Sequence, residues 1–254
     1  MSDFPEFARL VSIMHRLRQE CPWDRKQTHQ SLRQYILEEA YETVEAIDNE
    51  DWEELKRELG DLMLQIVFQA KIAEEKNLFD LEEIAKHINE KLIRRHPHVF
   101  GTVQVQDEFD VKNNWEQIKI SEEERKSVLQ GVPRNLSGLL RAQRIQDKAA
   151  QVGFDWPEIN GVIEKIREEV EEVSRAIDGK NPEEIETEVG DLLFSVVNLA
   201  RFQKISAEDA LRRTINKFIA RFQYIEKKLA EKNVSIYESS LDEMDKLWEE
   251  SKNI

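Results

Sequence analysis

Hydrophobic positions recur at helical spacing along much of the chain. Over residues 31–47 the apolar side chains lie three or four positions apart, which predicts an amphipathic helix. The segment LGDLMLQIVFQA (59–70) is apolar on nearly every side of a helix. Because such a helix must be covered all round, we expect a bundle that flanking helices and a partner subunit complete.

This pattern occurs twice in the sequence. Residues 37–71 align without a gap on residues 167–201, an offset of 130 positions. A period this long indicates a duplicated domain, because solenoid repeats recur every 20–50 residues or so. We place the two domains at 1–128 and 129–254, with the seam in the polar stretch around Pro133.

Each copy also predicts a short turn between two antiparallel helices. The first helix should end near Asp48 in one copy and near Gly179 in the other. The second helix should begin after the N-cap residues Asp51 and Asn181, and Pro182 suits the first helical position. Each domain is therefore expected to be built on an antiparallel helix hairpin.

The composition of the chain favours one fold class and excludes several classes of binding partner. Only 8 Gly and 6 Pro in 254 residues favour an all-α fold. A net charge of −15 argues against binding to a nucleic acid polymer or an anionic membrane. The lone Cys21 excludes a disulfide framework and a cysteine-based zinc site. Since no long apolar run or apolar signal segment is present, we expect a cytoplasmic protein.

Acidic residues gather at matching heights on the two helices of each hairpin. At about 1.5 Å per residue, Glu42 and Glu58 lie roughly 9–10 Å from the turn, and Glu38 and Asp61 about 15 Å, so these pairs should face one another. Clustered carboxylates favour Mg²⁺, with Mn²⁺ as a substitute. The candidate metal ligands are Glu38, Glu39, Glu42, Glu58 and Asp61 in the first copy, and Glu168, Glu169, Glu172, Glu188 and Asp191 in the second.

These acids have two interpretations other than a Mg²⁺ site. A solvated acidic face is the simpler one, and an ancient duplication could carry such a face into both halves. A ferritin-like di-iron site is the other, but it needs Glu-x-x-His pairs. No histidine follows any of these acids at that spacing, which argues against di-iron.

The segments EEAYE (38–42), ELGD (58–61), EEVEE (168–172) and EVGD (188–191) resemble the motifs of the MazG family of nucleoside triphosphate pyrophosphohydrolases. The resemblance covers nearly the whole chain and is specific to the tandem-domain form. It implies an all-α fold, Mg²⁺ dependence, homodimerisation and hydrolysis of nucleoside triphosphates to the monophosphate and pyrophosphate. It also implies broad tolerance of the base and a role in clearing the nucleotide pool.

Cationic and aromatic residues extend the expected site. By position, the residues that tandem MazG proteins use around the nucleotide would be Lys217, Arg221 and Trp248, and the first copy offers Lys91, Arg94, Arg95 and Trp115. The alternative is that the cations are solvent-facing ion-pair partners and that the tryptophans belong to the core. A carboxylate that metal does not fully engage, Glu39 or Glu169, is the expected general base.

Three functional alternatives stay open at this point. One domain could be a non-catalytic module that binds metal or nucleotide or only dimerises. One domain could be a pyrophosphatase, for which the denser cationic run of the first copy would be suited. The chain could also act only on dUTP or dCTP.

Overall fold

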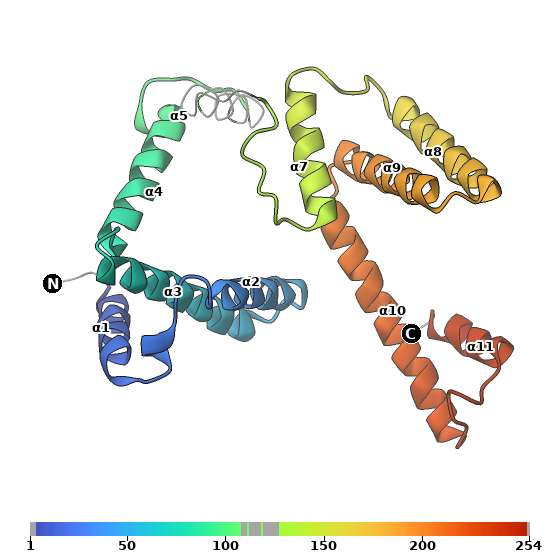
Figure 1. Ribbon diagram of the computed structural model, residues 1–254, viewed down its shortest axis with the longest axis horizontal. Helices are drawn as coiled ribbons and strands as arrows, with labels where there is room; N and C mark the ends of the chain where they lie inside the picture. Colours follow the sequence, from blue (N-terminus) through green and yellow to red (C-terminus); the bar gives the residue numbers. More distant parts are fainter. Residues whose placement is uncertain (1–3, 108–110, 112–117, 119–126, 253–254) are drawn as a thin grey trace. The chain divides into compact units, whose positions relative to one another are not determined.

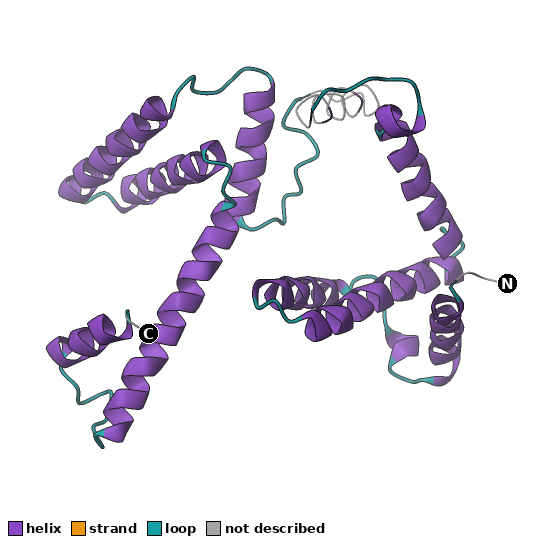
Figure 2. Cartoon of the chain, turned by 180° about the vertical axis from the view of Figure 1, so that it is seen from behind, coloured by secondary structure: helices purple, strands orange, loops and turns teal. Residues whose placement is uncertain are grey.

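A computed structural model describes residues 4–107, 111, 118 and 127–252. Every regular element in these residues is a helix and none is a strand, which confirms the all-α fold (Figures 1 and 2). The contacts divide the chain into two compact units, Met1–Glu122 and Glu123–Ile254. The sequence-based seam at 128/129 lies a few residues further along and stays a prediction.

The first unit is organised around a helix hairpin. The strongest packing is between α2 and α3, while α1 and α4 also pack against α3. Its core joins Met14 of α1 to Val67, Phe68 and Ile72 of α3. Its helices are α1 (Pro5–Glu20), the 3-10 turn η1 (Asp24–Lys26), α2 (Arg33–Asp48), α3 (Trp52–Glu75), α4 (Leu81–Arg95) and α5 (Pro97–Phe100).

The second unit repeats this hairpin and adds a pair of helices. Its hairpin is α8 with α9, and α7 packs on α9 as α1 packs on α3. A separate core between α10 and α11 contains Ile225, Leu229 and Leu247. Its helices are α7 (Gly138–Gln151), α8 (Ile159–Gly179), α9 (Pro182–Phe202), α10 (Ala207–Glu231) and α11 (Leu241–Ser251).

The two hairpin turns use the same local chemistry. Asp51 caps α3 by accepting a hydrogen bond from the Glu54 amide at 3.0 Å. Asn181 caps α9, and Pro182 occupies its first turn. One residue before each cap has a left-handed backbone, with φ of 53° at Glu50 and 55° at Lys180. This conformation reverses the chain within a few residues.

The inner hairpin helices keep an apolar stripe that neither unit covers. Its members follow i, i+4, i+7 spacing at equivalent positions of the two copies, and each is at least 40% exposed. They are Leu59, Met63 and Ile66 on α3, and Val189, Leu193 and Val196 on α9. The helices that the sequence shows as apolar all round are thus only partly covered within the described residues. None of the described helices is long and apolar enough to cross a membrane.

Candidate active site

The face that α2 turns towards α3 carries Glu39. Thr43 and Ala46 are the buried residues of α2, and Glu39 lies one and two turns before them on the same stripe. Glu38, one residue away, is rotated by about 100° and is exposed. It accepts a hydrogen bond from Gln34 at 2.7 Å instead of facing α3.

Three carboxylates of the first unit converge where α2 meets α3. Glu39, Glu58 and Asp61 each offer an oxygen within 4.8 Å of the others. The pKa of Glu39 is raised, first by burial and then by the negative charges of Asp61, Glu42 and Glu58. The expected pairing of Glu38 with Asp61 is therefore wrong, and Glu39 takes that place. A height along the helix axis does not say which side of the helix a residue faces.

The second unit brings together the equivalent acids. Glu169, Glu172 and Glu188 have oxygens within 4.8 Å of one another, and Glu169 is only 3% exposed. The pKa of Glu188 is raised by desolvation and then by the charges of Glu172, Asp191 and Glu169. Four carboxylates therefore share one region in each unit: Glu39, Glu42, Glu58 and Asp61, and their counterparts Glu169, Glu172, Glu188 and Asp191.

A lysine that sequence reasoning missed lies in the second cluster. The Lys165 Nζ is 2.7 Å from the Glu169 carboxylate and 2.8 Å from that of Glu168. These hydrogen bonds raise the pKa of Lys165. Its position four residues before Glu169 is the signal that could have revealed it. The counterpart in the first copy is Tyr35, so only the second cluster contains this cation.

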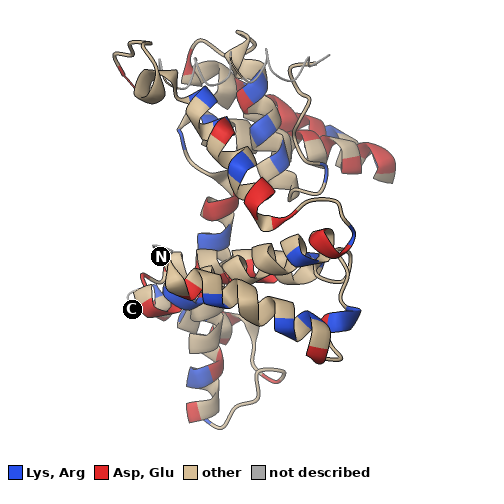
Figure 3. Ribbon diagram, turned by 90° about the vertical axis from the view of Figure 1, so that its left-hand side faces the viewer, with Lys and Arg blue, Asp and Glu red and all other residues tan. Residues whose placement is uncertain are grey.

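The donor set fits a hard divalent cation. All the donors are carboxylate oxygens, which is what Mg²⁺ prefers. The Glu169 Oε2 atom is buried and has no hydrogen-bond partner among the described residues. Basic residues occur on the helices of both units (Figure 3). Within the described part of the chain, however, no Lys or Arg forms an ion pair with Glu39, Glu58 or Asp61.

Of the three residues predicted to contact the nucleotide in the second copy, Arg221 and Trp248 lie against each other. The Arg221 guanidinium lies over the Trp248 ring, 5.5 Å from its centroid, and Phe218 packs on the same ring at 5.1 Å. Lys217 is exposed, one turn before Arg221 on α10. Among the described residues, neither Lys217 nor Arg221 is ion-paired with a carboxylate of the second cluster.

The corresponding residues of the first copy lie at the end of α4. Lys91 is half-buried, Arg94 is exposed, and Arg95 is only 7% exposed. Lys91 and Arg95 are four residues apart and share one face of α4, with Arg94 beside them. Trp115 lies outside the described residues.

A model of the MazG nucleotide pyrophosphohydrolase domain matches residues 27–100 and again residues 158–225. The chain belongs to the MazG family. Each matched segment contains one complete carboxylate cluster. Membership makes the chain a hydrolase of phosphoanhydride bonds.

Full-length relatives agree with this assignment. The chain is 46% identical over 250 residues to the nucleoside triphosphate pyrophosphohydrolase/pyrophosphatase MazG of Thermotoga maritima, covering 97% of this chain and 95% of the relative. It is 42% identical over 254 residues to the nucleoside triphosphate pyrophosphohydrolase of Escherichia coli, covering 96% of each. A solved MazG-related protein from Thermotoga maritima is 28% identical, with a TM-score of 0.40 over 44% of this chain and 97% of its own.

Proposed function

We propose that this MazG chain hydrolyses nucleoside triphosphates to the monophosphate and pyrophosphate in a Mg²⁺-dependent reaction. Broad tolerance of the base would suit it to clearing the nucleotide pool of the cytoplasm. Family membership and the names of the two full-length relatives support the reaction type. The observation that carries the proposal is the convergence of carboxylates in each hairpin, with a buried oxygen of Glu169 that has no hydrogen-bond partner in the described part of the chain.

Four residues of each cluster would hold the cation: Glu39, Glu42, Glu58 and Asp61 in the first unit, and Glu169, Glu172, Glu188 and Asp191 in the second. Bound Mg²⁺ supplies charge neutralisation at the phosphate oxygens and lowers the pKa of bound water. Glu38 and Glu168 are the sequence candidates that lie aside, because Glu38 bonds to Gln34 and Glu168 to Lys165. They are not part of this proposed set.

Glu169, which is 3% exposed, and the half-buried Glu39 are the proposed general bases. Glu169 uses one oxygen to pair with Lys165 and keeps Oε2 without a partner, so its carboxylate is held in one orientation. It would accept the proton of the attacking water. Glu39 would do the same in the first unit, where a Gln65 side chain bonds to it. In this scheme Lys165 positions Glu169.

Cations outside the clusters would hold the triphosphate. Lys217 and Arg221 share one face of α10 and would bind phosphate oxygens and stabilise the pyrophosphate leaving group. Trp248 supports Arg221 by stacking against its guanidinium. We assign the main nucleotide site to the second domain on this basis.

The first domain would catalyse a different reaction from the second. Its cluster lacks the Lys165 cation, and its Lys91, Arg94 and Arg95 form a denser cationic run at the end of α4. The name of the Thermotoga maritima relative includes a pyrophosphatase activity. We therefore assign pyrophosphate hydrolysis to the first domain as the second candidate function, with a purely binding or dimerising role as the outcome that contradicts it.

A second copy of the chain is the proposed partner. The uncovered stripe of Leu193, Val189 and Val196 on α9 has an equivalent on α3, and each stripe begins one residue after a glutamate of its cluster. Such apolar surface is typical of an interface between subunits. Homodimerisation would complete the helix bundles.

Product analysis tests the reaction. The full-length protein is incubated with each of the eight common NTPs and dNTPs, with Mg²⁺ and with EDTA. In full-length protein that carries Glu42→Gln, so that the first domain does not hydrolyse the product, we expect monophosphate and pyrophosphate in equal amounts, from all eight, and only with metal. Diphosphate with inorganic phosphate, or release that persists in EDTA, would contradict the proposal.

A further inference from the structure

The second unit contains a cavity that the carboxylate cluster does not account for. It has a volume of about 370 Å³ and lies between α7, α8, α9 and the loop from α7 to α8. Its walls are largely apolar and include the aromatic rings of Phe154, Trp156 and Phe194. Cavities of this size with apolar walls and a few polar groups are typical of small-molecule sites.

The cavity adjoins the second cluster. Lys165 lines it and pairs with Glu169 at 2.7 Å. Ser195 also lines it and lies one helical turn after Asp191 on α9. An occupant of the cavity would therefore lie beside phosphates held at the carboxylates.

Two side-chain amides in the cavity wall are held so that one offers a hydrogen-bond acceptor and the other a donor. Gln146 is 7% exposed and donates its Nε2 to the Phe194 carbonyl at 2.8 Å, so its Oε1 remains as an acceptor. That oxygen is buried and has no partner among the described residues. Asn198 accepts from the Arg201 Nε at 2.9 Å through its Oδ1, so its NH₂ remains as a donor. Arg201 is itself anchored by Asp155 at 2.5 Å.

We propose that this cavity receives the nucleobase of the substrate, with Gln146 accepting a hydrogen bond from the base and Asn198 donating one to it. This inference rests on the proposed function. Each common base carries an N–H donor next to an acceptor on its Watson–Crick edge, and enzymes that bind an isolated base read that edge while stacking its faces. One acceptor and one donor serve all of these edges, so the site binds every base without strong preference.

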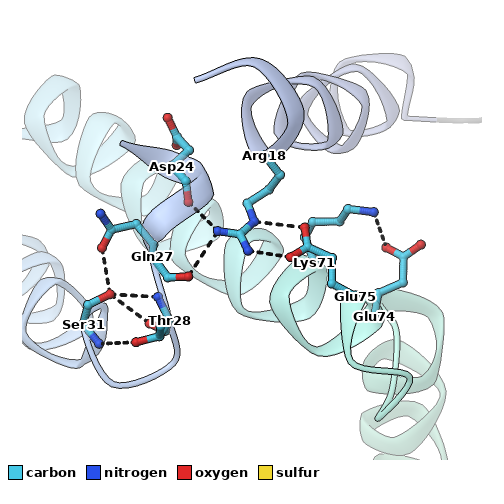
Figure 4. A network of polar contacts seen from close by, with 8 residues as sticks. All are labelled: Arg18, Asp24, Gln27, Thr28, Ser31, Lys71, Glu74 and Glu75. Carbon is cyan, nitrogen blue, oxygen red and sulfur yellow. Dashed lines mark hydrogen bonds and ion pairs between the residues drawn. The ribbon is translucent and has the colours of Figure 1, made fainter. Parts of the chain in front are cut away.

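In the first unit, the place that corresponds to this cavity, between α1, the following loop and α3, is occupied by the Arg18 side chain. Arg18 of α1 has a side chain that is 8% exposed and pairs with Glu75 of α3. It also donates to the backbone carbonyls of Asp24 and Gln27 in the following loop (Figure 4). The place between α1, this loop and α3 is filled by the guanidinium. The base-binding cavity is thus assigned to the second domain alone.

Two substitutions separate base binding from phosphate binding. Asn198→Asp keeps the shape and the acceptor for Arg201 but removes the donor, and Gln146→Met keeps the volume but removes the acceptor. Asn160→Asp, at an exposed position in the first turn of α8, adds the same charge away from the cavity wall and serves as the control. All are made in full-length protein that carries Glu42→Gln, so that the first cluster does not dominate the signal.

Calorimetric titration with Mg²⁺ then compares α,β-imido analogues of ATP, GTP, CTP and UTP with inorganic tripolyphosphate. We expect both cavity variants to bind the four analogues about tenfold more weakly, since a buried hydrogen bond is lost, and to bind tripolyphosphate unchanged. Unchanged affinity for the analogues, or an equal loss for tripolyphosphate, would overturn the assignment. Binding needs no turnover, so failure of the proposed hydrolysis would show separately as absent pyrophosphate release by the unsubstituted protein.

Discussion

The ammonium of Lys165 lies 2.7 Å from the carboxylate of Glu169, a residue that is only 3% exposed. This pair places a fixed positive charge inside one of two otherwise equivalent acidic clusters. The first cluster has Tyr35 at that position, and there burial and the neighbouring acids raise the pKa of Glu39. The two copies therefore surround the equivalent glutamates Glu39 and Glu169 with different charges.

Replacing Lys165 with Met should leave Glu169 buried without its counter-charge. Because Lys165 is partly exposed, we expect a loss of about 1 kcal/mol, or a fall of roughly 4 °C in the unfolding midpoint of the second domain. Added Mg²⁺ should reverse most of this loss by supplying the missing charge. Differential scanning calorimetry with and without Mg²⁺ measures both effects. Lys227→Met, at an exposed site, is the control, and a Mg²⁺ response equal to that of the unsubstituted protein would count against the role of Lys165.

The raised pKa of Glu39 predicts how the metal-free first domain responds to pH. The folded domain holds this proton more tightly than the unfolded chain does, because of burial and the charges of Asp61, Glu42 and Glu58. The stabilisation from this proton is complete below the pKa that Glu39 has in the unfolded chain. It is lost as the pH rises through the raised pKa that Glu39 has in the folded domain. In EDTA, the first domain should thus lose stability as the pH rises above the ordinary pKa of 4.5.

The variant Glu39→Gln tests this behaviour, because it has no proton to lose. We expect its first domain to unfold at a higher temperature than the unsubstituted protein at pH 7, and the advantage to vanish below pH 4.5. Glu38→Gln is the matched control one residue away, on the exposed side of α2. Equal pH profiles for the two variants would show that Glu39 does not titrate as described.

The Arg18–Glu75 pair is expected to stabilise the first domain. Arg18→Met removes a buried guanidinium and the hydrogen bonds that it donates to the carbonyls of Asp24 and Gln27, while Glu75, whose side chain is 35% exposed, regains water. The change should cost about 1–2 kcal/mol in urea unfolding at pH 7. The hydrogen bond from Arg18 lowers the pKa of Glu75, so this stabilisation is lost as pH falls through the lowered value. Arg16→Met, which breaks an exposed pair with Glu20, should cost no more than about 0.5 kcal/mol. A penalty for Arg18→Met as small as that of the control would contradict the burial argument.

The uncovered stripe on α9 predicts dependence on a second subunit. Leu193→Asp places a charge in the centre of that stripe, and light scattering coupled to gel filtration should show a monomer where the unsubstituted protein is a dimer. Thr187→Asp on the same helix, outside the stripe, should remain dimeric. A monomeric unsubstituted protein at micromolar concentration would refute homodimerisation.

Much of the fold follows from local sequence signals. Asp51 and Asn181 cap the inner helices, and the spacing of apolar residues around Ala46 and Ala176 marks the faces that pack. These features act within a few residues of the chain, so a sequence pattern is sufficient to locate them.

The arrangement of the candidate site was less accessible to sequence reasoning. Axial heights bring Glu38 opposite Asp61, but the packed stripe of α2 turns Glu39 inward instead. The Gln146 amide bonds to the Phe194 carbonyl, 48 residues away, and Asn198 is held by Arg201, whose own anchor Asp155 is 46 residues away, so no short motif encodes this arrangement. Tertiary packing decides these details.

The most direct measurement is the rate of pyrophosphate release from ATP with Mg²⁺ by full-length protein with one glutamate of each cluster changed to Gln. We predict that Glu172→Gln loses nearly all of the release by the second domain, and that the double variant with Glu42→Gln releases none while keeping its helix content. Glu171→Gln, at an exposed neighbouring position, should behave as the unsubstituted protein. Pyrophosphate release by the double variant at the unsubstituted rate would contradict the assignment of both clusters as metal-dependent active sites.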